Sequence, residues 1–296
     1  MRCFVAVAET LHFGRAADLL GIAQPPLSRT VARFEARLGV MLFERTSRRV
    51  QLTAAGAALL PEARAILVAT GTAERTIRQL ATGGPRLILA AKAGGSSTLV
   101  ARLLRAYAAT PDAVPVDIEL ADVGKFRRQV LAGAADVAIL HLPYDTTDGL
   151  DFDVLDIESQ VLLLPRDHAL ATRSEVDAGD ISESIEPPMG RWPNEDGTFP
   201  PGRGPEVHSL TQLIQLVGLG RALAQLPRSA CADLPYGVVA VPILGAAAVT
   251  TVIAWAESSR SQLTADFVRA ATKPSRADPY SLVAQVTPHA AEDGNV

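Results

Sequence analysis

Residues 16–56 read AADLLGIAQPPLSRTVARFEARLGVMLFERTSRRVQLTAAG, and this stretch decides the fold of the N-terminal domain. It begins inside a predicted helix, Gly14–Leu20. Gly21 then stands where a tight turn needs a positive φ. The next helix is predicted to start near Pro25, because proline in a first helical turn sacrifices no intrahelical hydrogen bond.

The helix that starts near Pro25 has one apolar stripe. Its members recur at helical spacing and are Leu27, Val31, Phe34 and Leu38. This spacing predicts that they face the core. The polar residues Ser28, Arg29 and Arg33 lie off the stripe and are therefore expected at the surface.

Upstream, a short helix is predicted to begin at Phe4 and to end near Leu11. Small helices joined by a glycine turn, with polar residues opening the last one, are typical of a helix-turn-helix. Such a motif places the start of its last helix at base edges in the major groove. There Gln24 suits adenine, and Arg29 suits guanine or a phosphate. The alternative is a plain three-helix core.

Downstream, Val40–Thr53 predicts two short strands around a polar tip. Arg48 and Arg49 at this tip are placed to enter a minor groove or to meet phosphates. Residues 1–60 hold eight arginines against four acidic residues, although the whole chain has a net charge of −4. This asymmetry favours a nucleic-acid partner for the N-terminal part. The alternative is a solvated basic surface with an ordinary hairpin.

A long helix is predicted from Thr53, a suitable N-cap, to about Thr82. Pro61 is expected to bend it, and Gly83-Gly84-Pro85 stops it. Apolar residues at spacings of four and three predict a two-chain coiled coil. The proposed dimerisation residues are Leu59, Ala63, Ile66, Ala73, Ile77 and Leu80. The alternative is an amphipathic helix packed on its own domain.

The remaining two-thirds alternates strands and helices. Strands are predicted at Arg86–Ala91, Val116–Leu120 and Asp136–Leu140, with a helix at Lys125–Ala132. This alternation indicates an α/β domain with a largely parallel sheet. A second lobe is predicted to begin at Gln160–Leu170.

Ligands of such sheets bind at the carboxyl ends of the strands. The first strand is followed by Gly94-Gly95-Ser96-Ser97-Thr98 and a helix, an arrangement that suits an anion. The alternative is that one hydroxyl merely caps the helix. The candidate ligand-binding residues are Lys92, Gly95, Ser96, Ser97, Thr98, Val123 and His141, with Arg191, His208 and Ser209 from the second lobe. For the latter three, the alternative is a surface or capping role.

Several classes of protein are not supported. There is no metal-ligand spacing, no GxSxG motif and no pair of carboxylates that the pattern places together, so we expect neither an enzyme nor a metal or cofactor. Cys3 and Cys231 fall in different predicted domains, so no disulfide is expected. No apolar run approaches the roughly 18 residues of a membrane span, and no signal peptide is apparent. We therefore expect a cytoplasmic protein.

Residues 16–56 resemble the DNA-binding domain of the LysR family of bacterial transcriptional regulators nearly residue for residue. The segments DVAIL, VLLLPRDHAL, LIQLVGLGRALAQLP and TVIAWA resemble the effector domain of that family in order and spacing. The resemblance implies DNA contacts from the helix-turn-helix and its wing. The residues expected to make them are Gln24, Pro25, Ser28, Arg29, Arg33, Arg48 and Arg49.

The resemblance also implies the domain organisation. It comprises a winged helix-turn-helix at 1–53, a linker helix at 54–83 and a two-lobed, periplasmic-binding-protein-like effector domain at 86–276. Lobe 1 is expected at 86–159 and 258–276, lobe 2 at 160–257, and a disordered tail at 277–296. A small-molecule effector, operator DNA, a second copy of the chain in dimers that pair into tetramers, and RNA polymerase are the implied partners.

The chain departs from the family pattern in two places. Family members usually begin a few residues earlier, so we expect either a shortened first helix or a start upstream of Met1. Residues 183–206 are dense in proline and glycine and are hard to align with the family. A DNA-binding regulator without an effector response therefore stays an alternative. A pure solute-binding module is a weaker alternative, because it gives the helix-turn-helix no purpose.

Overall fold

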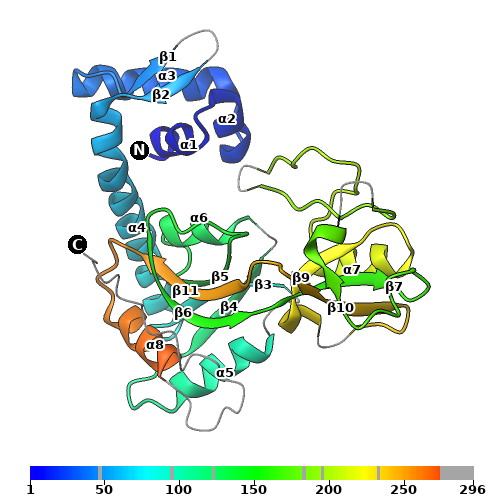
Figure 1. Ribbon diagram of the computed structural model, residues 1–296. Helices are drawn as coiled ribbons and strands as arrows, with labels where there is room; N and C mark the ends of the chain where they lie inside the picture. Colours follow the sequence, from blue (N-terminus) through cyan, green and yellow to red (C-terminus); the bar gives the residue numbers. More distant parts are fainter. Residues whose placement is uncertain are drawn as a thin grey trace, which may run out of the picture.

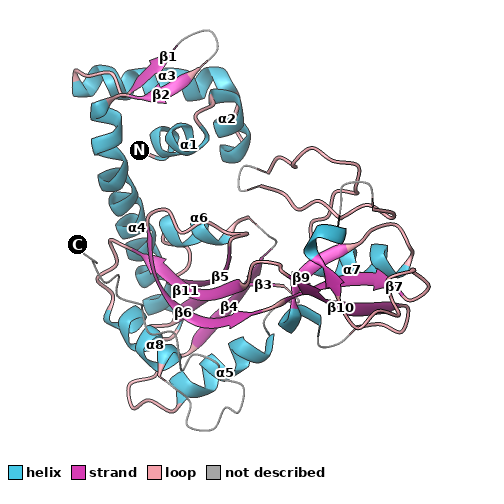
Figure 2. Cartoon of the chain, in the orientation of Figure 1, coloured by secondary structure: helices cyan, strands magenta, loops and turns pink. Residues whose placement is uncertain are grey.

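The computed structural model describes residues 1–45, 49–93, 97–121, 124–181, 185–194, 197–231 and 234–273. An N-terminal helical domain is joined by one long helix, α4, to a region of two lobes (Figure 1). The secondary structure is mainly helical in the N-terminal domain and mixed in the two lobes (Figure 2). The expected tail at 277–296 lies outside the described residues.

The N-terminal domain contains α1 (Arg2–Thr10), α2 (Phe13–Leu20) and α3 (Gln24–Leu38). A hairpin of β1 (Phe43–Arg45) and β2 (Val50–Leu52) follows them. Gly21 ends α2 with φ 63°, as its place after the helix predicts.

Part of the expected stripe on α3 forms the core of this domain. Leu27 and Val31 are buried, and Phe34 packs against the same core. Leu38 was expected inside but is 43% exposed, because α3 ends there and Gly39 turns the chain away. Glu35 is buried instead.

Helix α4 (Ala54–Thr82) runs unbroken through Pro61. The side chain of Thr53 caps its start by accepting from the amide of Gly56, and Gly83 ends it with φ 116°. Among the described residues it is the helix whose length and apolar content match a membrane span, although only 17% of that stretch is buried. Ion pairs from Arg64 to Glu9 and from Arg75 to Asp136 fix the helix to the folded domains on both sides.

Lobe 1 is a five-stranded sheet in the order β4-β3-β5-β11-β6. Its strands are β3 (Leu87–Lys92), β4 (Val116–Ala121), β5 (Val137–Leu142), β6 (Leu150–Glu158) and β11 (Val249–Ala256). The first three are parallel, whereas β11 is antiparallel to both β5 and β6. The helices of this lobe are α5 (Ser97–Ala108), α6 (Phe126–Leu131) and α8 (Gln262–Thr272). Helix α8 packs on α5 of lobe 1 through Phe267 and Tyr107.

Lobe 2 is a four-stranded sheet in the order β8-β10-β7-β9. Its strands are β7 (Gln160–Pro165), β8 (Val176–Asp177), β9 (Ala224–Pro227) and β10 (Val238–Leu244). Its α-helix is α7 (Leu210–Gly218), and two short 3₁₀ turns, η1 (Ala178–Asp180) and η2 (Arg228–Cys231), complete it.

The expected lobe boundary at 257 is wrong. Strand β11 was assigned to lobe 2, but it lies between β5 and β6 in the sheet of lobe 1. Val252, Ile253 and Ala254 are buried against the partner strands on either side. A strand buried in this way is apolar in sequence whichever sheet it joins, so its apolar pattern does not reveal the lobe.

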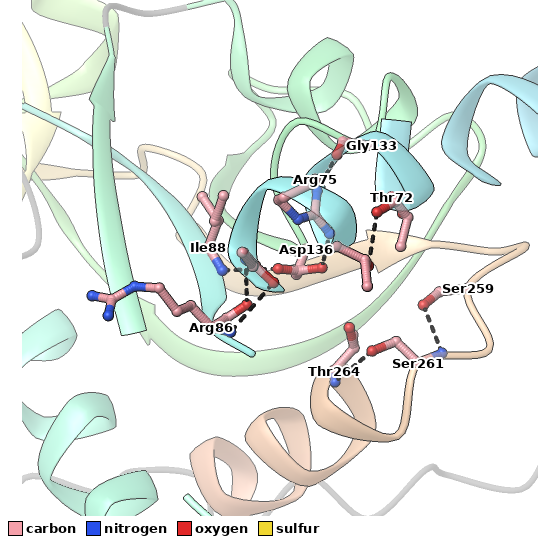
Figure 3. A network of polar contacts seen from close by, with 11 residues as sticks. Thr72, Arg75, Arg86, Ile88, Gly133, Asp136, Ser259, Ser261 and Thr264 are labelled. Carbon is pink, nitrogen blue, oxygen red and sulfur yellow. Dashed lines mark hydrogen bonds and ion pairs between the residues drawn. The ribbon is translucent and has the colours of Figure 1, made fainter. Parts of the chain in front are cut away.

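Helix α4 docks closely on lobe 1 at two glycines. A Cβ on Gly71 would overlap the carbonyl oxygen of Ala132, and a Cβ on Gly133 would lie 2.6 Å from the carbonyl oxygen of Val68. Beside this contact, Arg75 donates to the carbonyl of Gly133 and pairs with Asp136 (Figure 3).

The partners of Arg75 are themselves anchored in the sheet. Asp136 accepts from the backbone amide of Ile88 on β3 at 2.8 Å (Figure 3). Burial raises the pKa of Asp136, while the neighbouring Arg75 and the amide of Ile88 oppose the shift. The carboxylate therefore connects the linker helix to the central sheet of lobe 1.

Replacing Gly71 by alanine is expected to destabilise the docked helix. The new methyl group has no room, and overpacking typically costs about 1–3 kcal/mol, against a gain in helix propensity of about 1 kcal/mol at most. Calorimetry should show a lower transition temperature for Gly71→Ala. Thr76→Ala places alanine at an exposed position of the same helix and is the control. Equal transition temperatures for the two variants would contradict the close contact.

Candidate nucleic-acid interface and effector cavity

The exposed start of α3 carries the predicted DNA-reading residues. Ala23 is the N-cap, and Gln24, Pro25 and Pro26 form the first turn. Gln24, Pro25, Arg29 and Arg33 are exposed, and Ser28 is half-buried. The helix therefore presents amide, hydroxyl and guanidinium groups on the side away from Leu27 and Val31, as the sequence predicts.

Glu35 fixes the wing to α3. One carboxylate oxygen accepts from the amides of Leu42 and Phe43 at 2.9 and 3.1 Å, and the other pairs with Arg45 at 2.7 Å. The guanidinium of Arg45 also lies 4.5 Å from the ring centre of Phe13. These contacts make α3 and the hairpin one rigid unit. This role of Glu35 was not predicted from the sequence, because a carboxylate on a helix face is usually solvated.

The wing tip is only partly described. Arg48 lies outside the described residues. Arg49 is exposed immediately before β2.

A cavity of about 420 Å³ lies between the two lobes. Lobe 1 supplies Lys92, Ala93, Gly124, His141, Pro143, Tyr144, Asp145 and Thr146. Lobe 2 supplies Trp192, Pro193, Asn194, His208, Ser209, Leu210, Gln225, Leu226, Pro227, Ser229 and Ala230. Its volume lies in the range of small-molecule sites.

The structure brings part of the predicted effector set to this cavity. Lys92, His141, His208 and Ser209 lie on its wall. Ser209 also caps α7 by accepting from the amide of Gln212. Gly95, Ser96 and Val123 lie outside the described residues.

The other predicted effector residues lie elsewhere. Ser97 and Thr98 are exposed at the start of α5 and are not part of the described wall. Arg191 is not part of that wall either, because its guanidinium holds its own loop together. It donates to the carbonyls of Gly204 and Pro200, both at 2.7 Å, and pairs with Glu206.

Some wall residues were not predicted from the sequence. Trp192 and Asn194 come from the segment that resisted alignment, and Tyr144 and Asp145 come from the loop after β5. Loops have no periodicity from which an inward direction can be inferred. The segment LPYD after a buried strand was the one available signal.

An ion pair dominates the electrostatics of the wall. The ammonium of Lys92 lies 2.9 Å from the carboxylate of Asp145, which also accepts from the amide of His141 at 2.8 Å. Burial, and to a smaller extent the nearby Lys92, lower the pKa of His141 to about 4, while Asp145 acts in the opposite direction. At neutral pH the imidazole of His141 is therefore uncharged.

A second polar group lies at the hinge between the lobes. The hydroxyl of Tyr144 donates to the side-chain oxygen of Gln160, and the amide nitrogen of Gln160 donates to the carbonyl of Ala247 at 2.7 Å. Burial raises the pKa of Tyr144, and the bond to Gln160 opposes this. The cavity wall is thus bonded to both chain segments that connect the lobes.

Family comparison accounts for both parts of the chain. The model of the bacterial regulatory helix-turn-helix protein, lysR family, matches residues 1–57, and the model of the LysR substrate binding domain matches residues 81–273. The chain belongs to the LysR family of transcriptional regulators. It is a DNA-binding regulator with a substrate-binding domain, and its relatives are regulators rather than enzymes.

Individual relatives agree with this assignment. The regulator AlsR of Bacillus subtilis (strain 168) is 29% identical over 242 residues, which cover 78% of this chain and 80% of AlsR. The uncharacterized regulator YnfL of Escherichia coli (strain K12) is 31% identical over 251 residues, covering 77% and 81%. The LysR regulator expected from the sequence is confirmed.

Solved structures share the fold. A full-length OxyR variant from Pseudomonas aeruginosa superposes with a TM-score of 0.51 at 24% identity, covering 91% of this chain and 92% of its own. Full-length CbnR, solved in a complex with its target DNA, also gives a TM-score of 0.51 at 24% identity, covering 91% and 96%. The expected fold class is confirmed.

Acidification is expected to destabilise the folded protein because His141 is buried in its uncharged form. The unfolded chain takes up this proton near pH 6.5, whereas the folded protein does so only near pH 4. Between these values the unfolded state binds more protons, so the free energy of unfolding falls as the pH falls. Across this pH window, the free energy of unfolding of wild type should fall by on the order of 3 kcal/mol more than that of His141→Gln. Urea denaturation at several pH values measures this, and parallel curves would contradict it.

Proposed function

We propose that this chain is a cytoplasmic homodimeric regulator that binds operator DNA through α3 and the wing and responds to a small molecule held between its lobes. The observation that carries the proposal is the cavity of about 420 Å³, which both lobes line. A ligand that touches both lobes binds some lobe arrangements better than others, and this difference is what a ligand-driven switch requires.

Gln24, Pro25, Ser28, Arg29 and Arg33 are proposed to meet DNA from α3. This role is supported by their position on the outer side of the helix, while Leu27 and Val31 on the opposite side pack into the core. Proteins of this architecture insert the start of the reading helix into the major groove. We also predict DNA contacts from Arg48 and Arg49 in the wing. A contact with RNA polymerase is a further prediction.

The cavity favours an effector response over the alternative of a regulator that has none. The segment that raised this alternative supplies Trp192, Pro193 and Asn194 to the cavity wall. It therefore forms part of a concave, mostly apolar surface with a few polar groups, as ligand sites generally do. The anionic effector considered for the sequence has less support, since the ammonium of Lys92 already has a carboxylate partner.

The dimer is proposed to form along α4 from Ile66 onward. Ile66, Ile77 and Leu80 are 48%, 68% and 67% exposed within one chain, and Ala73 is also exposed. Leu59 and Ala63 do not belong to this seam. Ala63 is fully buried and Leu59 packs in the core of the chain's own N-terminal domain, because the first half of α4 covers α1.

The proposed mechanism is a population shift. Ligand in the cavity changes the angle between the lobes, and the contacts between subunits change the spacing of the paired α3 helices on DNA. A coupling of roughly 1–3 kcal/mol is typical of such switches. Pairing of dimers into tetramers is a further expectation.

Arg29→Ala is expected to weaken binding to the DNA immediately upstream of the protein's own coding sequence. Loss of a good base contact costs about 1–3 kcal/mol, whereas loss of a phosphate contact lowers the salt dependence by about one unit. Fluorescence anisotropy across a salt series distinguishes the two. The control is Arg173→Ala, which removes the same charge from an exposed site in lobe 2. If both variants bound as wild type does, Arg29 would have no place in the interface.

Ile77→Asp combined with Leu80→Asp is expected to convert the dimer to a monomer. Carboxylates at these positions repel across a seam and place charge where apolar contact is needed. Sedimentation velocity measures the change, and Thr76→Asp, off the apolar seam on the same helix, is the control. A double variant that stays dimeric at micromolar concentration would place the interface elsewhere.

A further inference from the structure

Two side chains of opposite charge on the cavity wall, Lys92 and Asp145, form an ion pair with each other. Of the residues described on this wall, Lys92 is the lysine and Asp145 the carboxylic acid, and the wall includes no arginine or glutamate among them. Lys92 and Asp145 are paired at 2.9 Å, with their side chains only 18% and 7% exposed. Salt screens a pair that is this far buried much less than it screens a surface pair.

Asp145 is held in place by the backbone. Its carboxylate accepts from the amide of His141, and its own amide donates to the carbonyl of His141 at 2.9 Å. The carboxylate therefore closes a tight turn at the end of β5. It cannot leave Lys92 without also giving up this part-buried hydrogen bond, and the amide of His141 would then lose its partner at a cost in free energy.

A ligand carboxylate at Lys92 would consequently meet two unfavourable conditions. It would lie beside the fixed carboxylate of Asp145, and juxtaposed like charges strongly disfavour a partner. It would also find no compensating charge on His141, because burial and Lys92 keep the pKa of this imidazole at about 4. A neutral group that accepts one hydrogen bond from Lys92 avoids both conditions.

The residue types on the wall and the volume of the cavity favour a ring compound. Trp192 and His208 of lobe 2 and Tyr144 of lobe 1, which carry ring side chains, line the cavity. Leu210 and Pro227 add apolar surface. A volume of about 420 Å³ exceeds the roughly 150 Å³ of a cavity that takes benzene, so a substituted ring fits.

We infer that Asp145 determines the charge specificity of the cavity, which takes an uncharged ring compound with a hydrogen-bond acceptor in preference to a ring carboxylate. This inference rests on the proposed effector site. Asp145 acts through Lys92 by neutralising it, and removal of its charge converts the site to one that accepts a carboxylate.

Matched pairs of probes test this specificity. Benzamide and nicotinamide are compared with benzoate and nicotinate, by calorimetry on the full chain and by Trp192 fluorescence in a Trp255→Phe background. In wild type, the amides should bind at least about tenfold more tightly than their carboxylates, because only the carboxylates meet a like charge. In Asp145→Asn this ratio should fall at least about tenfold.

Two controls keep the result interpretable. Asp112→Asn removes an exposed carboxylate outside the cavity and should leave the ratio unchanged. In the Asp145→Asn variant, the side-chain oxygen of the new asparagine can still accept from the amide of His141, and unchanged thermal unfolding would show an intact fold. If Asp145→Asn fails to fold, Asp145→Ser carries the same expectation.

The inference is overturned if carboxylates bind wild type as tightly as the amides, if the ratio does not change in Asp145→Asn, or if no amide binds at millimolar concentration. Operator binding is measured on the same preparations without any probe. Its loss would refute the DNA-binding part of the proposed function. Intact operator binding together with tight carboxylate binding would refute only the charge specificity.

Discussion

The contact between helix α4 and lobe 1 is the constraint on which the arrangement of the whole molecule depends. Gly71 and Gly133 let the backbones of the helix and the α6 region touch, and no larger side chain fits at either position. Arg75 and Asp136 then fasten this contact to the sheet. Above it, Arg64 pairs with Glu9 of α1 at 3.0 Å, and Arg127 of α6 approaches the same carboxylate at 3.6 Å. The DNA-binding domain, the linker helix and lobe 1 therefore meet at Glu9.

The division of labour between the domains follows from this contact. The DNA-binding domain is rigid internally, because Glu35 bonds α3 to the wing. The first half of α4 completes the core of that domain, with Ala63 fully buried there, whereas the second half lies on lobe 1 and keeps Ile77 and Leu80 exposed. One helix thus serves as core element, docking element and exposed apolar surface along its length.

The DNA-binding domain could be predicted from sequence because its signals are local. Gly21, Pro25 and the spacing of Leu27 and Val31 each fix a turn, a helix start or a buried side. The sheet and cavity depend on distant partners. Strand β11 would be buried in either lobe, so its apolar pattern does not indicate which sheet it joins. Arg191 had the chemistry of an anion binder but satisfies carbonyls of its own loop. The inward direction of Trp192 and Asp145 is set by loops without periodicity.

The two chain segments that connect lobe 2 to lobe 1 lie side by side. Glu158 at the end of β6 and Val249 at the start of β11 are register partners, and Gln160 bonds to Ala247 across the two connecting segments. Domain insertions are tolerated where the ends of the inserted segment lie close together. In evolutionary terms, residues 160–247 form a cassette. Exchanging this cassette replaces one wall of the cavity and leaves the DNA-binding domain, the linker and the sheet of lobe 1 as they are, which gives the regulator a route to new ligands at a fixed operator.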